Sequence, residues 1–152
     1  PILGIIILSV KISLDRYHEY KQYDMLNHSV ILSNKITTLV HELQKERGMT
    51  AGFLGSKGEK FKEELPKQRI LSNKKKDQLH SFMNELNIKE YDKKYQDLVK
   101  SAFDRLAKLE TIRSNISSMN ITGKKAIAYY FSNFQIREVM NIVMKELKEL
   151  IH

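Results

Sequence analysis

The chain has 152 residues, of which 41% are hydrophobic, so it can bury one ordinary core and is not generally disordered. It has only two prolines and six glycines, and it is rich in residues that lose little rotamer freedom in a helix. We therefore expect an all-α protein. The absence of cysteine excludes disulfides, thiolate metal sites and cysteine nucleophiles.

A formal net charge of +8 is compatible with nucleic acid, an anionic membrane surface or a small anion as the partner. The only dense basic run is Lys74-Lys75-Lys76, which lacks the interleaved aromatic residues typical of single-strand or RNA readers. A solvated helix face explains this run better, so we expect no nucleic-acid partner. A basic nucleic-acid-binding bundle remains the weaker alternative.

Residues 1–10 are apolar throughout, and Lys11 is the first charge. Ten residues cannot span a bilayer, which needs about 20. Strongly polar helical sequence follows without a break, so we expect residues 1–10 to be the outer end, a remnant, of a transmembrane helix. A buried helix end or a truncated signal sequence is the alternative. Residues 11–152 are then expected to form a helical bundle.

Breaks in the helical pattern divide the chain into four helices. The first runs from Ile2 to about Ala51, the second from about Glu59 to Leu86, and the third from about Tyr91 to Met119. Thr122 is the predicted N-cap of a fourth helix that ends at Ile151. Short connections favour an antiparallel four-helix bundle, whose long first helix extends from the membrane segment.

An arginine interrupts the apolar face of the first helix. At 100° per residue, Arg47 lies about 20° from Ile36, which places it at the centre of that face together with Thr50. Glu46 and Gln44 lie about 80° to either side. This phase predicts that the Arg47 guanidinium points into the bundle.

The third helix repeats the pattern, because Arg113 lies about 20° from Ala102 on its apolar face. A buried arginine stays ionised, so something anionic should meet it. One alternative is an internal ion pair with Glu138, Glu46 or Glu110. The other is a bound anion, held by the bidentate donors that suit planar oxyanions.

The inner face of the second helix is interrupted by Gln68, Ser72 and Lys75, with Arg69 at its edge. These polar side chains either line the interior of the bundle with hydrogen-bond donors or mark a less buried segment. In the fourth helix, apolar residues follow a 4-3-4-3 spacing from Ile136 to Leu150. That spacing predicts a coiled-coil seam, which a dimer mate or a C-terminal continuation of the chain would cover.

Enzymatic chemistry has little support in the sequence. The five histidines show no His-x-x-x-His spacing, and no loop matches a phosphate-binding motif. We expect no catalytic residues, no metal site and no cofactor.

The stretch Leu43–Ser56, LQKERGMTAGFLGS, resembles the signature of the nitrate- and nitrite-sensing (NIT) family of bacterial chemoreceptors and sensor kinases. The resemblance continues through Phe61, Leu65 and Gln68-Arg69. A second similar stretch leads from Leu109–Arg113 to Ile127–Tyr130, so roughly residues 36 to 145 are covered. In this family the domain usually continues into a second helical half, which implies that residues 11–152 are a sensor bundle or the first half of a longer one.

The resemblance implies that Arg47, the arginine of the Glu-Arg-Gly signature, helps to bind an oxyanion between helices. Together with the interior polar residues, the predicted ligand-binding set is Arg47, Arg113, Gln44, Thr50, Gln68 and Arg69.

The resemblance further implies an extracytoplasmic, periplasmic sensor segment of a protein of the bacterial inner membrane. The protein would be a methyl-accepting chemotaxis receptor, a homodimer that binds nitrate, nitrite or a similar small oxyanion and signals through helix repacking. The alternative is a ligand-free helical dimerisation or interaction module of a membrane receptor, whose arginines are paired internally.

Overall fold

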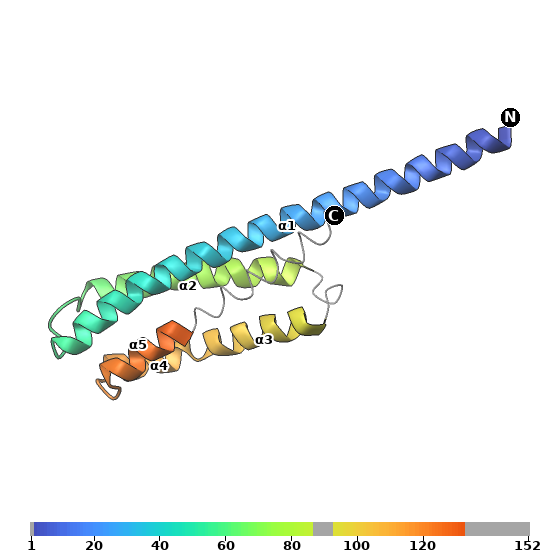
Figure 1. The fold of residues 1–152 in the computed structure, drawn as a ribbon. Coiled ribbons are helices and arrows are strands. Elements are labelled where there is room, and N and C mark those ends of the chain that lie inside the picture. The colour runs from blue at the N-terminus through green and yellow to red at the C-terminus, as the bar shows by residue number, and fades with distance from the viewer. Residues whose placement is uncertain (1, 87–92, 133–152) are drawn as a thin grey trace.

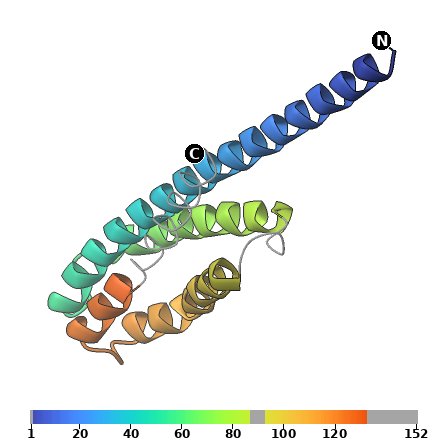
Figure 2. The ribbon, with the colours of Figure 1, turned by 45° about the vertical axis from the view of Figure 1, so that its right-hand side comes forward.

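The computed structural model describes residues 2–86 and 93–132, apart from the side chains of Met25, Tyr95 and Leu98. The described elements are α-helices, which confirms the all-α prediction (Figure 1). They are α1 (Ile2–Gly55), α2 (Glu64–Glu85), α3 (Lys93–Ala107), α4 (Leu109–Ser117) and α5 (Gly123–Ser132). The helix pair α3 and α4 runs along one direction and forms one leg of the bundle, so α1, α2, α3–α4 and α5 make four packed legs (Figures 1 and 2). The first helix is much longer than the others.

The inward face of α1 is a stripe of buried residues with a 4-3-4-3-4 spacing. The stripe consists of Leu32, Ile36, Leu39, Leu43, Glu46 and Thr50, all at most 5% exposed. A spacing of 3.5 residues keeps one seam facing its neighbours along the helix. The last two positions of this seam are polar, and they mark where the apolar core changes into a polar one.

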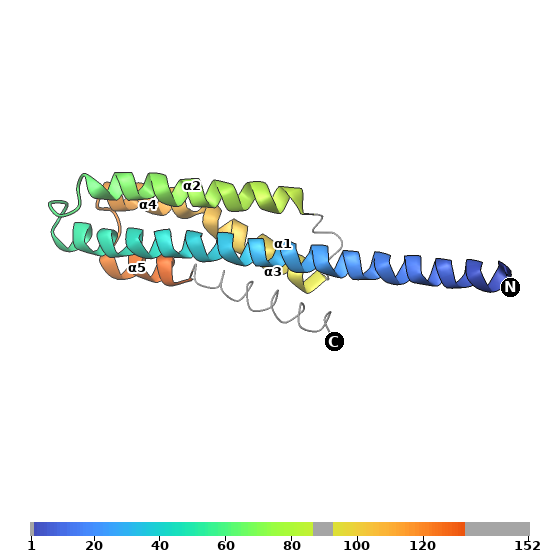
Figure 3. The same ribbon diagram turned by 90° about the horizontal axis from the view of Figure 1, so that it is seen from above.

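Glycines shape the connection between α1 and α2. Gly58 has a φ of +92°, which L-residues rarely adopt, and its N–H donates to the Phe53 carbonyl at 2.8 Å. The Phe61 ring lies against Gly52, where an added Cβ would come within 2.6 Å of ring carbons. The turn therefore packs closely on the last turn of α1 and returns the chain alongside it as α2 (Figure 3).

The second and third predicted helices differ from the observed ones in their boundaries. The second begins at Glu64 rather than at about Glu59, and Pro66 lies in its first turn, where its missing N–H costs nothing. The third is interrupted at Lys108, whose N–H donates to the Arg105 carbonyl three residues back instead of four.

The fourth leg begins where the sequence predicts. Thr122 precedes α5, and its Oγ1 accepts a hydrogen bond from the Lys125 N–H at 3.4 Å, as an N-cap residue does. The predicted continuation of this helix to Ile151, and the coiled-coil seam from Ile136 to Leu150, lie outside the described residues.

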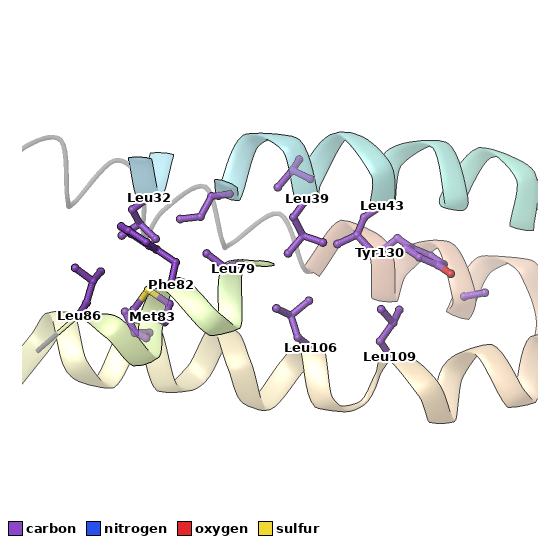
Figure 4. Close-up of a cluster of buried hydrophobic side chains, with 14 of the residues drawn as sticks. Leu32, Leu39, Leu43, Leu79, Phe82, Met83, Leu86, Leu106, Leu109 and Tyr130 are labelled. Carbon is purple, nitrogen blue, oxygen red and sulfur yellow. The ribbon is translucent and has the colours of Figure 1, made fainter. Parts of the chain in front are cut away.

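All four legs contribute apolar side chains to one core (Figure 4). In the close-up, Leu39 and Leu43 from α1 approach Leu106 and Leu109, which lie on either side of the α3–α4 break. The ring of Tyr130 closes one end. Burial of each large apolar side chain contributes about 1.5–3 kcal/mol, which holds the legs together before any polar contact is counted.

The first two dozen residues of α1 project beyond the other helices (Figures 1 and 3). Every described side chain from Ile2 to Asp24 is exposed, including Ile5, Ile6 and Ile7. Among the described residues, none of the helices combines the length and the apolar character needed to cross a membrane.

Candidate functional site: a polar core beside Arg47

Glu46 is the centre of a polar cluster inside the bundle. Its side chain is 0% exposed, and it follows directly after the apolar positions of the α1 seam. Arg113 of α4 approaches it from the opposite leg, with Nε donating to Oε1 and Nη2 donating to Oε2, both at 2.7 Å. This bidentate geometry joins the first and third legs.

The remaining donors of Arg113 are also engaged. Its Nη1 donates to Asn73 Oδ1 on α2 and to Glu110 Oε1 on its own helix, each at 2.6 Å. Arg113 thus makes four hydrogen bonds to side chains of three helices and is 3% exposed. The internal ion-pair alternative is what the structure shows for this arginine, with Glu46 as the main partner. Glu138, the other candidate partner, lies outside the described residues.

Tyr130 attaches α5 to the same carboxylate. Its hydroxyl donates to Glu46 Oε1 at 2.7 Å, and Thr50 Oγ1 donates to the Tyr130 oxygen at 3.5 Å. Both Thr50 and Tyr130 are at most 2% exposed. A single buried carboxylate therefore connects α1 with α4 and α5.

Arg69 of α2 lies at the edge of this cluster, as predicted. Its Nη1 donates to Ser117 Oγ at 2.8 Å, and its Nε is 4.0 Å from Glu46 Oε1. Arg69 Nε and Ser72 Oγ are both buried and have no hydrogen-bond partner within the described part of the chain. The polar positions of α2 do line the interior, since Ser72 is 0% and Gln68 5% exposed.

The cluster contains charges of both signs. Glu46 and Glu110 bring two negative charges, Arg113 and Arg69 bring two positive ones, and Lys76 Nζ lies 4.0 Å from Glu110 Oε1 at its edge. Burial by itself would raise the pKa of Glu46, but the hydrogen bonds and charge of Arg113 outweigh it and hold that pKa below its usual value. Burial likewise raises the pKa of Tyr130, and the Glu46 carboxylate raises it further, so its hydroxyl stays protonated as a donor.

The prediction that Arg47 points into the bundle is wrong, because the buried position belongs to its neighbour Glu46. Arg47 is only half-buried, and its guanidinium carbon lies 4.5 Å from the centroid of the Phe131 ring on α5. The prediction assumes 3.6 residues per turn, but the buried stripe of α1 repeats every 3.5 residues. Over the eleven residues from Ile36 to Arg47 these two repeats differ by about 30°, which moves Arg47 away from the centre of the stripe. The arginine consequently lies between the interior and the surface.

The remaining predicted residues occupy separate places. Gln44 is exposed on α1. Gln68 is buried, but its amide donates to the backbone carbonyl of Glu42 at 3.1 Å and to the Glu42 carboxylate at 2.7 Å. Of the predicted set, the structure brings Arg113, Thr50 and Arg69 together around Glu46. Arg47 lies one residue along the chain on the side of α5.

An open groove of about 630 Å³ runs along α2 and does not include Arg47. Its lining carries Lys35 and Lys74 but also the carboxylates of Asp77 and Glu85. Two acidic groups disfavour an anion there. Within the described ranges, no group of three or more histidine or acidic residues is arranged to hold a metal ion.

The predicted ligand-binding set omits four residues that lie at or beside the site, namely Glu46, Asn73, Tyr130 and Phe131. The sequence predicts Glu46 only as a flanking residue and as one of three candidate ion-pair partners of a buried arginine. A signal for Glu46 was present, since it continues the 4-3-4 spacing of Leu39 and Leu43. Asn73 and Phe131 carry no such signal, because their roles depend on how other helices dock.

A comparison with known protein families matches the part of the chain that contains these residues. The family model described as nitrate and nitrite sensing matches residues 38–132, which include the Glu46 cluster, Arg47 and Phe131. A search of curated proteins found no match. Among solved structures, the chain is similar to the NasR transcription antiterminator, with a TM-score of 0.76 and 19% identity over 95% of this chain.

The chain spans 38% of the length of that NasR chain, so the likeness concerns one part of a larger protein and shows the fold. The family match, in contrast, covers well over half of this chain and contains the residues of the polar core. The chain therefore belongs to the nitrate- and nitrite-sensing (NIT) domain family.

Proposed function

We propose that this domain binds nitrate, nitrite or a similar small oxyanion through Arg47 and passes the binding event on through helix packing. The observation that carries the proposal is where its two signature arginines lie in the fold. Arg113 is 3% exposed and bonds to Glu46 and Glu110 in the interior. Arg47, which lies within the residues matched by the nitrate- and nitrite-sensing family, is half-buried at the margin of the bundle, so part of its side chain is in contact with solvent.

The surroundings of Arg47 fit this role. Gly48, the following residue, is exposed, and an added Cβ there would meet no described atom within 4 Å. Gln44, one turn earlier, is exposed and supplies an amide donor on the same helix. In this proposal Arg113, Thr50 and Gln68 build the scaffold, and Arg69 completes its charge balance.

Contacts between α1 and α5 link the proposed binding residue directly to the packing of the bundle. Arg47 contacts Phe131, and the preceding residues of each helix, Glu46 and Tyr130, are joined by a buried hydrogen bond. An anion that binds one packing of α1 and α5 more tightly than another shifts the population between them, by no more than its difference in affinity. The long α1 would carry this change away from the site.

A second candidate function is supported by one observation. The internal ion pair between Glu46 and Arg113 is what a ligand-free dimerisation or interaction module would contain. In that case the domain would be a helical spacer, and anions would affect it no more than they affect any basic protein.

Thermal unfolding separates these two functions. At a nitrate concentration 100 times the dissociation constant, binding to the native state adds about 2.7 kcal/mol, which raises the midpoint by about 5 to 10 °C. We expect this shift with nitrate but not with equal chloride, and we expect Arg47→Ala to abolish it. Lys45→Ala, which removes a neighbouring exposed cation, is the matched control and should keep the shift. Equal effects of nitrate and chloride would favour the ligand-free module.

We also propose that the domain belongs to a membrane-anchored, homodimeric chemotaxis receptor and lies outside the cytoplasm. The support is the run of exposed apolar side chains at the start of α1, where Ile5 is 65% and Ile7 62% exposed. In cells making the complete protein, changing Ile5, Ile6 and Ile7 together to Glu should move it out of the membrane fraction. Val30→Glu, at another exposed apolar position of α1, should not. Retention of the triple variant in the membrane would refute anchoring through this run.

A further inference from the structure

We propose that the break between α3 and α4 is a hinge whose angle is set by α5, so that a movement of α5 swings α3 while α4 stays in place. The two helices meet at Lys108, where the hydrogen-bond register shifts from four residues to three. Residues 93–117 contain no proline or glycine, which are the usual internal causes of a sharp break in a helix. A short 3₁₀ segment inside a helix often marks a hinge.

Helix α5 is bonded to both the backbone and the side chain of Arg105, the residue that accepts the shifted hydrogen bond. The Arg105 carbonyl accepts from the Lys108 N–H at 3.0 Å and from the Tyr129 hydroxyl at 2.7 Å. The guanidinium of Arg105 donates from Nη1 to the carbonyl of Ser132, the last residue of α5, at 3.1 Å. A side chain that enters the hydrogen-bond ladder of a helix is a known cause of a kink. These two bonds therefore tie the break to the last turn of α5.

The helices on the two sides of the break are held differently. Helix α4 is fixed in the interior by Arg113, which is 3% exposed and bonded to Glu46 through two hydrogen bonds of 2.7 Å. Helix α3 instead borders an apolar cavity of about 20 Å³ between itself, α1 and α2, with Val99, Phe103 and Leu106 in its lining. Among the described residues, none from α4 lines this cavity. Protein interiors are otherwise close-packed, so α3 has room to move that α4 lacks.

Helix α5 also connects this hinge with the polar core. Tyr130 donates to Glu46, and the preceding residue, Tyr129, donates to the hinge. Because Glu46 precedes Arg47 on α1, a displacement of α5 relative to α1 reaches α3 through Arg105. The hinge itself is a property of the fold, and only its response to nitrate rests on the proposed function.

The test measures distances between paired spin labels in the complete protein. These 152 residues contain no cysteine, so labels are attached to cysteines introduced at exposed positions, with any other cysteine of the protein replaced by serine. The α3 pair is Asn34→Cys with Asp97→Cys, and the α4 pair is His41→Cys with Ser114→Cys. Asp97 lies about 16 Å along the helix from the break, so a swing of roughly 10° displaces it by about 3 Å.

Two variants act on the hinge from its two bonds to α5. Tyr129→Phe removes the hydroxyl but keeps the ring, and we expect it to change the α3 distance by about 3 Å and to leave the α4 distance unchanged. Arg105→Met removes the bond to Ser132 and should change the α3 distance in the same direction. Tyr23→Phe, the same change at a tyrosine that is 73% exposed, is the matched control and should change neither distance. An unchanged α3 distance in Tyr129→Phe or in Arg105→Met, or equal changes in both pairs, would overturn the hinge.

A nitrate titration of the labelled protein then tests the link with ligand binding. We expect nitrate, but not equal chloride, to change the α3 distance, and we expect Tyr129→Phe to lose this response. If nitrate raises the unfolding midpoint but leaves the α3 distance unchanged, the link is wrong and the proposed function stands. If nitrate does not raise the midpoint, the proposed function is wrong, and the comparison of Tyr129→Phe with the wild type still decides the hinge.

Discussion

Arg113 and Glu46 meet in the interior of the bundle with almost complete burial on both sides. Two ions lose their hydration there, and only close, bidentate contact with further hydrogen bonds offsets that cost. Here the pair has these additional bonds, from Tyr130 to the carboxylate and from Arg113 to Asn73. The pair therefore defines how all four legs fit together more than it adds to net stability.

Breaking this pair from one side should be costly. We expect Arg113→Met to lower the free energy of unfolding by about 3–5 kcal/mol, because Glu46 is left as a buried charge without its main partner. The double variant Arg113→Met with Glu46→Leu should recover a large part of this loss. Urea unfolding measures both. The exposed pair Arg16–Glu19 is the control, and Arg16→Ala should change stability by less than about 1 kcal/mol.

The loss of folding stability at acid pH should depend on Glu46. Its pKa is lower in the folded chain than in the unfolded one, so its contribution is present above the unfolded value, about 4.3. As the pH falls from there through the lower folded value, the carboxylate is protonated and the contribution is lost. Unfolding between pH 6 and pH 2.5 should show this decline in the wild type and a shallower one in Glu46→Gln. Equal slopes would contradict the assignment.

At the scale of the elements, two glycines of α1 have opposite surroundings. An added Cβ on Gly48 would meet no described atom within 4 Å, whereas the Phe61 ring fills the position of a Cβ on Gly52. Alanine is favoured over glycine in a helix by about 1 kcal/mol, so Gly48→Ala should raise stability by about that amount. Gly52→Ala must displace the ring, and overpacking of this kind costs about 1–3 kcal/mol. We expect it to be neutral or destabilising in thermal unfolding.

A second change isolates the cause at Gly52. In a chain that also carries Phe61→Ala, the added methyl group meets no ring, so Gly52→Ala should become stabilising relative to Phe61→Ala alone. If Gly52→Ala destabilises equally in both backgrounds, the turn after α1 is not held by this contact.

The molecule as a whole consists of a packed bundle and a helical extension. From Ile2 to Asp24 the described side chains of α1 are exposed, whereas from Leu32 onward α1 carries the central seam. Helix without packing is only marginally stable in water. By hydrogen exchange in solution, we expect backbone amides of residues 6–24 to exchange orders of magnitude faster than those of residues 36–54. Similar protection of both segments would show that the extension has a packing partner.

The sequence predicts much of the architecture. Sparse glycine and proline place the helix boundaries within about five residues, because these residues interrupt helices wherever they occur. It also predicts that Arg113 faces inward, and it leaves open whether Gln68 and Ser72 line the interior or belong to a less buried segment. It does not predict the break at Lys108, where no proline or glycine stands and the hydrogen-bond register simply shifts.

What the sequence by itself determined is the all-α character, the order of the legs and the presence of an arginine on the apolar face of each of two helices. Local propensity and periodicity carry that information. Only the tertiary structure decided that Glu46, not Arg47, occupies the interior and that Arg47 lies against Phe131. The two residues differ by 100° on one helix, and the choice between them depends on the partners that α4 and α5 bring, Arg113 and Tyr130. The 4-3-4 spacing of α1 is compatible with a buried Glu46, but only pairing across distant segments supplies the partners that neutralise it there.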